Sequence, residues 1–218
     1  MPLVTLVISF LIALLFVVMI QIHVFEVAFA KLGLTPQDSL LLIVSTLVGS
    51  GINLPLFTKH AKQLGHMVIS RDKKPVWEIY QPAREGKVVI ALNVGGCLIP
   101  VGLCFYFISL QIIEPWKIVL ALSAITSLSY NLSRIIPGLG VGMPIFIAPL
   151  AAAALALILD PDHAAHLAYI SGVLGVLIGA DILRLKNIID LGAPVAVIGG
   201  AGTFDGIFIT GIIAALLA

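Results

Sequence analysis

Long apolar segments separated by short polar ones recur along the whole chain of 218 residues. About seven of them approach the length of about 20 residues that an α-helix needs to cross a hydrocarbon core. They cover approximately residues 3–25, 39–57, 88–113, 116–131, 144–159, 164–185 and 191–217. The pattern predicts an all-α membrane protein, in which a bundle of about seven transmembrane helices forms a single domain over residues 1–218.

Residues 58–87 form the only long polar segment, and we expect them to be a cytoplasmic loop. Two short β-prone runs, residues 66–69 and 76–80, flank a polar turn and predict a small β-hairpin-like loop. Two interpretations stay open, because the loop could lie on anionic headgroups or pair with a peptide through an exposed edge. Residues 194–198, at the start of the last apolar segment, also suit extended chain.

The composition agrees with a lipid environment. Hydrophobic residues make up 60% of the chain and charged residues 11%, with a mean hydropathy of +1.16, whereas soluble domains are about 25% charged. The net charge of +1 predicts no nucleic-acid partner. Cys97 and Cys104 lie seven positions apart in one apolar segment. This separation is too large for a disulfide if the segment is a helix, so both are expected to be buried thiols.

The basic residues predict the orientation of the chain in a cell membrane. With the N-terminus in the cytoplasm, only Lys31 and Lys117 face outward, and the C-terminus also lies outside. The other basic residues fall on cytoplasmic segments, as the positive-inside rule requires: Lys59, Lys62, Arg71, Lys73, Lys74, Arg84, Lys87, Arg134, Arg184 and Lys186. We therefore expect a multi-pass protein whose first partner is the lipid bilayer.

Two aspartates within the apolar segments are the candidate chemical groups, because charges inside a membrane are costly and usually functional. Asp181 lies in the segment Ile178–Leu183, and Asp205 lies in the glycine-rich segment Gly199–Gly206. Irregular, glycine-rich backbone at membrane depth is tolerated only beside protein or water, so a polar cavity is expected near Asp205. Pairing of Asp181 with Arg184, three positions along a helix, is the alternative for the first aspartate.

These two segments resemble the aspartyl intramembrane proteases, the class of presenilin, signal peptide peptidase and prepilin peptidase. Those enzymes carry one Asp on a helix and a second on the next helix, within a Gly-x-Gly-Asp motif. The resemblance covers about residues 172–211. Phe204 stands where the motif has its second Gly, Ala180 replaces a Tyr, and no Pro-Ala-Leu segment follows Asp205. The whole chain also resembles an uncharacterised prokaryotic integral-membrane family, a domain of unknown function.

The sequence leads to one functional hypothesis and two alternatives. Paired carboxylates that share a proton supply an acid and a base for hydrolysing an amide, so Asp181 and Asp205 are the expected catalytic pair. Gly202, Thr203 and Gly206 would bind the substrate, a transmembrane peptide. The alternatives are a small transporter or channel with Asp205 as an ion or proton site, and a non-catalytic membrane scaffold. A homo-oligomer would compensate for the short chain.

No cofactor or metal is expected. Asp160, Asp162, His163 and His166 form an acidic and imidazole cluster, but the sequence Asp160-Pro161-Asp162 is typical of a helix start with acids at its positive end.

Overall fold

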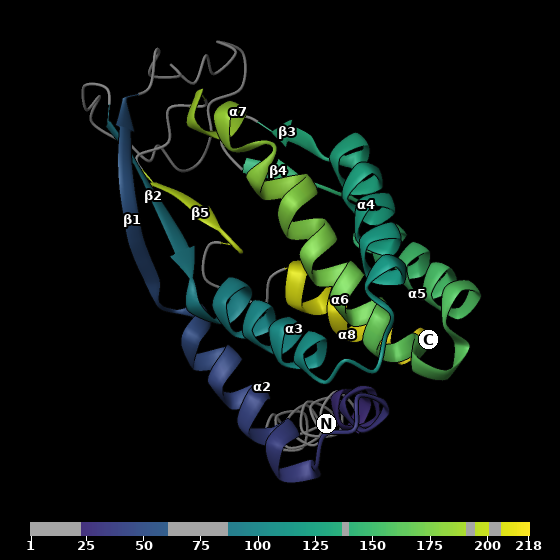
Figure 1. The fold of residues 1–218 in the computed structure, drawn as a ribbon. Helices are drawn as coiled ribbons and strands as arrows, with labels where there is room; N and C mark the ends of the chain where they lie inside the picture. Colours follow the sequence, from purple (N-terminus) through teal and green to yellow (C-terminus); the bar gives the residue numbers. More distant parts are fainter. Residues whose placement is uncertain (1–22, 61–86, 137–139, 191–194, 201–205) are drawn as a thin grey trace, which may run out of the picture.

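The computed structural model describes residues 23–60, 87–136, 140–190, 195–200 and 206–218. In these ranges, a helical bundle lies beside a small β-sheet (Figure 1). The bundle is formed by α4 (Pro115–Leu132), α5 (Ile147–Leu159), α6 (Ala164–Val176) and α8 (Gly206–Leu217).

α6 is the centre of the bundle. It packs against α3 (Ile99–Ser109), α4, α5 and α8, and nearly all of its residues are buried. Small residues allow this close packing. A Cβ atom added at Gly175 would lie 2.7 Å from Cγ2 of Ile125 on α4, and the alanines of α5 that face the core are fully buried. The chain continues from α6 through the π-helical turn η3 (Leu177–Ile182) to α7 (Leu185–Asp190).

The sheet has three strands in the order β1–β2–β5. β1 (Asn53–His60) runs antiparallel to β2 (Lys87–Asn93), and β5 (Val195–Ile198) runs parallel to β2. β2 is rich in β-branched and aliphatic residues and buries the side chains of Val88 and Ile90, as suits a central strand. β3 (Arg134–Ile136) and β4 (Gly140–Gly142) form a separate antiparallel pair after α4.

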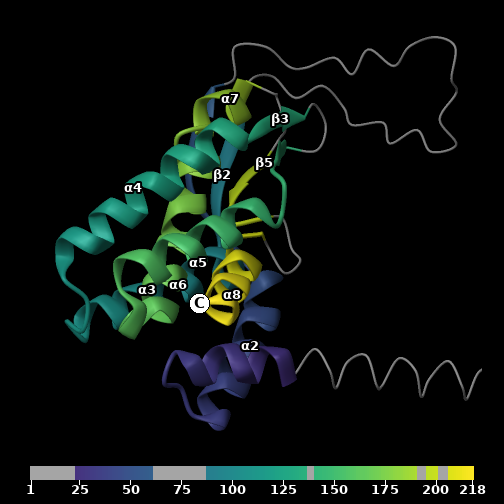
Figure 2. The same cartoon turned by 90° about the vertical axis from the view of Figure 1, so that its right-hand side faces the viewer.

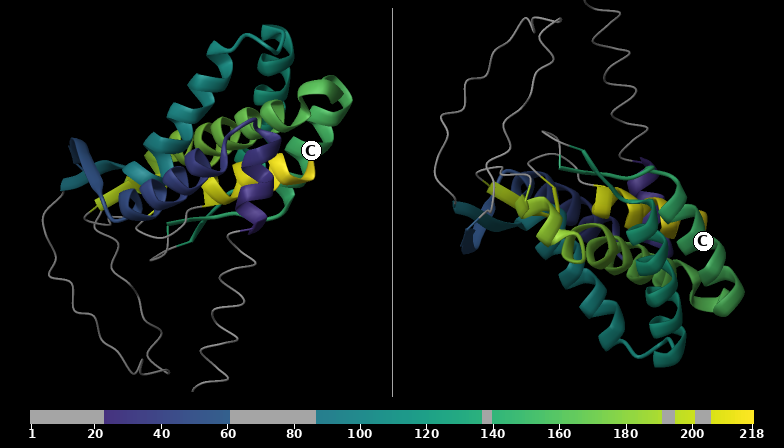
Figure 3. Two further views of the ribbon diagram at one scale, coloured as in Figure 1. Left: turned by 90° about the horizontal axis from the view of Figure 1, so that it is seen from below. Right: turned by 90° about the horizontal axis from the view of Figure 1, so that it is seen from above.

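Two helices close one end of the bundle. α2 (Pro36–Ser50) begins at Thr35, whose hydroxyl accepts the backbone N–H of Asp38 at 3.2 Å, a typical N-cap. The preceding helix His23–Lys31 is bent by 116° from α2 and crosses α8 in the view from below (Figure 3). Phe25 packs on Phe208 of α8, with ring centroids 6.1 Å apart, and Lys31 donates to the Leu216 carbonyl at 2.8 Å.

The predicted seven-span bundle is wrong. In the described ranges, only Pro161–Ile182 is long and apolar enough to cross a membrane, and the bent pair His23–Lys31 and Pro36–Ser50 adds a second candidate if it is one span. Three predicted spans contain strand residues: residues 39–57 end within β1, residues 88–113 begin within β2, and residues 191–217 include β5. A buried strand and a buried helix share the same apolar composition, which explains the error.

Other sequence predictions fare differently. The extended chain expected at residues 194–198 is confirmed for residues 195–198 by β5, and Pro194 lies outside the described residues. The predicted loop 58–87 falls mostly outside the described residues, as do both of its expected β-runs, but the strands that flank it, β1 and β2, pair antiparallel. Cys97 and Cys104 are both buried, as expected, and neither forms a disulfide bond.

Candidate functional site

Asp181 lies on η3, where the helix that begins as α6 widens into a π-helical turn. The backbone N–H of Leu183 donates to the carbonyl of Ile178, five residues earlier, at 2.9 Å. Single π-helical turns of this kind occur often at functional sites. The half-buried side chain of Asp181 uses Oδ2 to accept the backbone N–H of Gly199 at 2.9 Å. The carboxyl group is therefore tied to the residue that directly follows β5.

Gly199 and Gly200 form a turn that requires glycine. Their φ angles are +83° and +82°, a left-handed conformation that L-residues with a side chain rarely adopt. A Cβ atom added at Gly199 would lie 2.5 Å from Cβ of Cys97 and 3.0 Å from the carbonyl carbon of Gly96. The turn therefore sits between η3, through Asp181, and η1 (Val94–Leu98), which follows β2.

The end of β2 is fixed by Asn93, which is 1% exposed. Its Oδ1 accepts the backbone N–H of Gly96 at 2.7 Å, and its Nδ2 donates to the Ser50 carbonyl at 2.7 Å and to Oδ1 of Asn53 at 2.9 Å. Gly95 lies directly on the α2 backbone, and a Cβ atom there would collide with the carbonyl of Thr46. One amide side chain thus joins β1, α2 and η1.

The two parallel strands therefore end side by side in glycine turns, each followed in sequence by a helix. β2 leads through Asn93 and η1 to α3, and β5 leads through Gly199 toward α8. The carboxyl edge of parallel strands is the usual location of ligand sites in sheets flanked by helices. Among the described residues, Asp181 is the ionisable side chain with a hydrogen bond at this edge.

The other predicted site residues are only partly covered. Asp205, Gly202 and Thr203 lie outside the described residues, and Gly206 is the first residue of α8. The structure therefore positions one member of the predicted pair and the helix that directly follows the other.

Arg184 takes partners on α4. Its Nη2 donates to the Tyr130 carbonyl at 2.8 Å, its Nε donates to Oγ of Ser133 at 3.1 Å, and its guanidinium lies 4.1 Å from the centre of the Tyr130 ring. Arginine caps the carboxyl end of α4 in this way, while Asp181 bonds to Gly199. The alternative hypothesis that Arg184 is the partner of Asp181 finds no support in these bonds.

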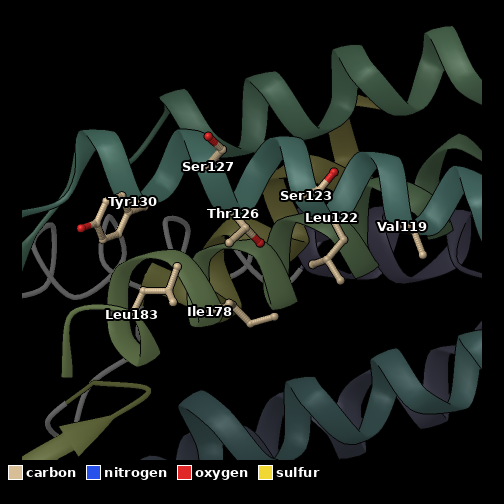
Figure 4. Close-up of a pocket in the computed structure, with 8 residues that line it drawn as sticks. All are labelled: Val119, Leu122, Ser123, Thr126, Ser127, Tyr130, Ile178 and Leu183. Carbon is tan, nitrogen blue, oxygen red and sulfur yellow. The ribbon is translucent and has the colours of Figure 1, made fainter. Parts of the chain in front are cut away.

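An open groove of about 520 Å³ runs between α4 and η3 (Figure 4). Its lining is mostly apolar with several hydroxyl groups: Val119, Leu122, Ser123, Thr126, Ser127, Tyr130, Ile178 and Leu183. η3 therefore presents Ile178 to the groove and Asp181 to the Gly199 turn, and Leu183, directly after η3, also lines the groove.

The second polar cluster joins the start of α4 to the end of α5. Oδ2 of Asp160 lies 3.1 Å from Nζ of Lys117, and its Oδ1 lies 3.2 Å from Nδ1 of His163. Burial raises the pKa of Asp160, but the hydrogen bonds and charges of Lys117 and His163 outweigh burial and lower the net pKa below the ordinary value. His166 instead packs edge-on against Phe107, at 5.0 Å between ring centroids. Among the described residues no group of three or more candidate ligands gathers into a metal site.

Sequence reasoning did not predict that Asn93 and Gly199 mark the ends of two strands at the candidate site. The available signal was that an apolar β-branched run is followed at once by Asn or Gly in both places, at Asn93–Gly96 and at Gly199–Gly200. This pattern is typical of a strand that ends in a tight turn.

Comparison with known proteins gives one family. A family model described as "Protein of unknown function (DUF1614)" matches residues 47–217. This range contains Asp181, Gly199 and Asn93, and the match confirms the expectation of an uncharacterised family. It adds no evidence for a resemblance to aspartyl intramembrane proteases. No curated protein and no solved structure matches the chain.

Proposed function

We propose that this chain, which belongs to the DUF1614 family of proteins of unknown function, hydrolyses peptide bonds with the carboxyl groups of Asp181 and Asp205. The observation that carries the proposal is the hydrogen bond from the Gly199 N–H to Oδ2 of Asp181. It brings Asp181 to the segment that leads to Asp205, six positions further along the chain.

The packing of α6 on α8 supports the pairing. A Cβ atom at Gly172 would meet Thr210 and Ala214, both at 3.5 Å, and one at Gly211 would meet Val173 at 2.5 Å. These contacts place the last turns of α6 against the middle of α8. η3 continues from the end of α6 and carries Asp181, and Asp205 directly precedes α8 in the sequence. The proposal requires that the two carboxyl groups meet at this pair of helices.

Two carboxyl groups within hydrogen-bond reach of each other can share one proton. In the proposed reaction, one carboxylate takes a proton from water as the water oxygen bonds to the peptide carbonyl carbon. The other carboxylic acid protonates the amide nitrogen as the C–N bond breaks. The products are a free carboxylic acid and a free amine, and the pair returns to its one-proton state. No cofactor enters the scheme.

The substrate proposed is an apolar, membrane-derived peptide. β5 is an edge strand of the sheet, and its first residue, Val195, is 48% exposed. An extended peptide can pair with an exposed strand edge through backbone hydrogen bonds, and β5 ends at the glycine that bonds Asp181. Large exposed apolar side chains on several helices, among them Phe105, Val119 and Ile158, favour a lipid bilayer as the surroundings. The proposed location is the cell membrane, with a cytoplasmic N-terminus and the C-terminus outside.

The test uses the full chain in detergent with a panel of labelled transmembrane peptides, and the products are identified by mass spectrometry. Asp181→Asn and Asp205→Asn are each expected to reduce cleavage by at least about 100-fold, in the range of general acid–base catalysis. Asp162→Asn is the matched control, because Asp162 is an exposed carboxylate in η2 (Pro161–His163), and it should cleave normally. Cleavage that survives Asp205→Asn would overturn the proposal.

The same variants test the alternatives. Proton or cation flux into proteoliposomes that depends on Asp205 and not on Asp181 would indicate a transporter or channel. A protein whose variants change only folding or assembly would indicate a scaffold.

A further inference from the structure

The described charged residues separate toward two ends of the molecule. Lys59 and Lys87 lie at the open end of the β1–β2 pair, where Lys59 faces Val88 and His60 faces Lys87. Arg134 begins β3, and Lys186 belongs to α7. β3, α7 and the open end of β1 and β2 lie at one end of the molecule in both Figure 1 and Figure 2. We call these four residues the basic end.

Arg184 holds part of this end together. By bonding Tyr130 and Ser133 it fastens the start of α7 to the end of α4, and therefore keeps Lys186 near Arg134. All four basic-end side chains are exposed, and none has an ion-pair partner among the described residues. The described acids nearest to this end in sequence are Asp181, three positions before Arg184, and Asp190, the last residue of α7.

The opposite end has the reverse character. The connections between α3 and α4 and between α5 and α6 lie there (Figure 1), together with the turn before α2. Most of the described acids lie in these connections or in the two helices on either side of that turn: Glu26, Asp38, Glu114, Asp160 and Asp162. The two cations at this end are both engaged, because Lys31 donates to the Leu216 carbonyl and Lys117 pairs with Asp160.

Exposed apolar side chains adjoin the unpaired cations. Ile182 and Leu183, before α7, are 46% and 52% exposed, and Phe57, two positions before Lys59, is 45% exposed. A basic surface that binds nucleic acid does not require exposed aliphatic side chains beside its cations. Cations beside exposed aliphatic and aromatic groups suit the boundary of a bilayer, where the side-chain stem meets acyl chains and the charged group meets phosphate.

We propose that the basic end binds the anionic phospholipid headgroups of one membrane leaflet. The attraction is electrostatic, because the unpaired cations of the basic end would lie against the negatively charged lipid phosphates. The same phosphates would repel the acid-rich opposite end. This inference does not depend on the proposed hydrolase activity. It would hold equally for a transporter or a scaffold.

The experiment titrates the full chain, in a neutral detergent, with phosphatidylglycerol or phosphatidylcholine and counts bound lipids by native mass spectrometry. Two variants change the net charge equally at opposite ends. Arg134→Gln with Lys186→Gln removes two positive charges from the basic end, and Gln37→Glu with Gln111→Glu adds two negative charges at the exposed opposite end. Lys59→Gln with Lys87→Gln is a second basic-end variant, in case the first fails to fold.

The wild-type chain is expected to prefer phosphatidylglycerol, and high salt should weaken the preference. Each cation near an anionic surface contributes about fivefold in affinity, so each basic-end variant should lose about tenfold or more, while the opposite-end variant stays near wild type. Equal loss in the variants at both ends would show a net-charge effect and overturn the inference. The inference would also be overturned if the wild-type chain bound both lipids equally, or if inorganic phosphate displaced phosphatidylglycerol as readily as added phosphatidylglycerol does.

Discussion

Replacing Gly179 with alanine tests how closely η3 packs on α4. A Cβ atom at this position would lie 2.5 Å from the Thr126 carbonyl oxygen, 2.8 Å from Cβ of Ser129 and 3.0 Å from the backbone nitrogen of Tyr130. Two of these atoms belong to the α4 backbone, so relief requires that a helix shift and not merely that a side chain rotate. Gly172, on the same continuous helix, is the matched control, because the nearest atoms to its added Cβ are side-chain carbons at 3.5 Å.

The expected magnitudes follow from two opposing effects. Overpacking costs about 1–3 kcal/mol, and exchanging glycine for alanine in a helix recovers about 0.5–1 kcal/mol. Its contacts at 2.5–3.0 Å, two of them with backbone atoms, put Gly179→Ala in the upper part of the overpacking range. It should therefore lower the free energy of unfolding by about 1–2 kcal/mol, which for a chain of this size lowers Tm by about 2–8 °C. Gly172→Ala meets only ordinary contacts, so it should leave Tm unchanged or raise it by up to about 4 °C.

Thermal unfolding of both variants beside the wild type, followed by circular dichroism in the same detergent, provides the measurement. Because Gly179 precedes Asp181 by two positions, any activity of the site should fall in Gly179→Ala more than in Gly172→Ala. An equal Tm for the two variants, or a more stable Gly179→Ala, would refute the close approach of η3 to α4 on which this reasoning depends.

Two further predictions concern buried polar groups. The net pKa of Asp160 is lowered by its partners, so its contribution to stability is complete above the pKa of about 4 of an unfolded Asp and is lost as the pH falls below that value. The difference in Tm between the wild type and Asp160→Asn should accordingly shrink from pH 7 to pH 3, and a constant difference would contradict the ion pair with Lys117. Asn93→Ala should cost about 1–3 kcal/mol, because it leaves the buried Gly96 N–H and Ser50 carbonyl without their partner; chemical unfolding of this variant beside the exposed Asn131→Ala would measure the cost.

The sequence predicted the helices where apolar residues run without interruption. Residues 116–131 and 144–159 correspond to α4 and α5, because alanine and leucine favour helix throughout these segments. Residues 39–57 were wrongly predicted to be one membrane-spanning helix, because the apolar residues from Asn53 to Thr58 resemble a continuation of α2 in hydropathy. Their true structure depends on pairing with β2, more than thirty positions away, and strand propensity is decided by such neighbours.

The candidate site shows the same division. The glycine-rich segment around Asp205 predicted irregular backbone, and Gly199 and Gly200 are indeed left-handed. The partner of Asp181 could not be predicted, because it is a backbone N–H of a turn and leaves no side-chain pattern in the sequence. The π-helical turn that orients Asp181 likewise depends on packing against α4 and β5. The periodicity of apolar residues in the sequence does not predict such a turn.

The bonds that close the two parallel strands differ in their access to water. The Gly96 amide donates to Asn93, whose side chain is almost wholly shielded, so its hydrogen exchanges only when α2, β1 and β2 separate together. The Gly199 amide donates to the half-exposed Asp181, where water can replace the acceptor without disturbing the sheet. The Gly199–Asp181 bond can therefore break and re-form in water while the sheet stays assembled, whereas the Asn93 bonds break only when the sheet itself opens.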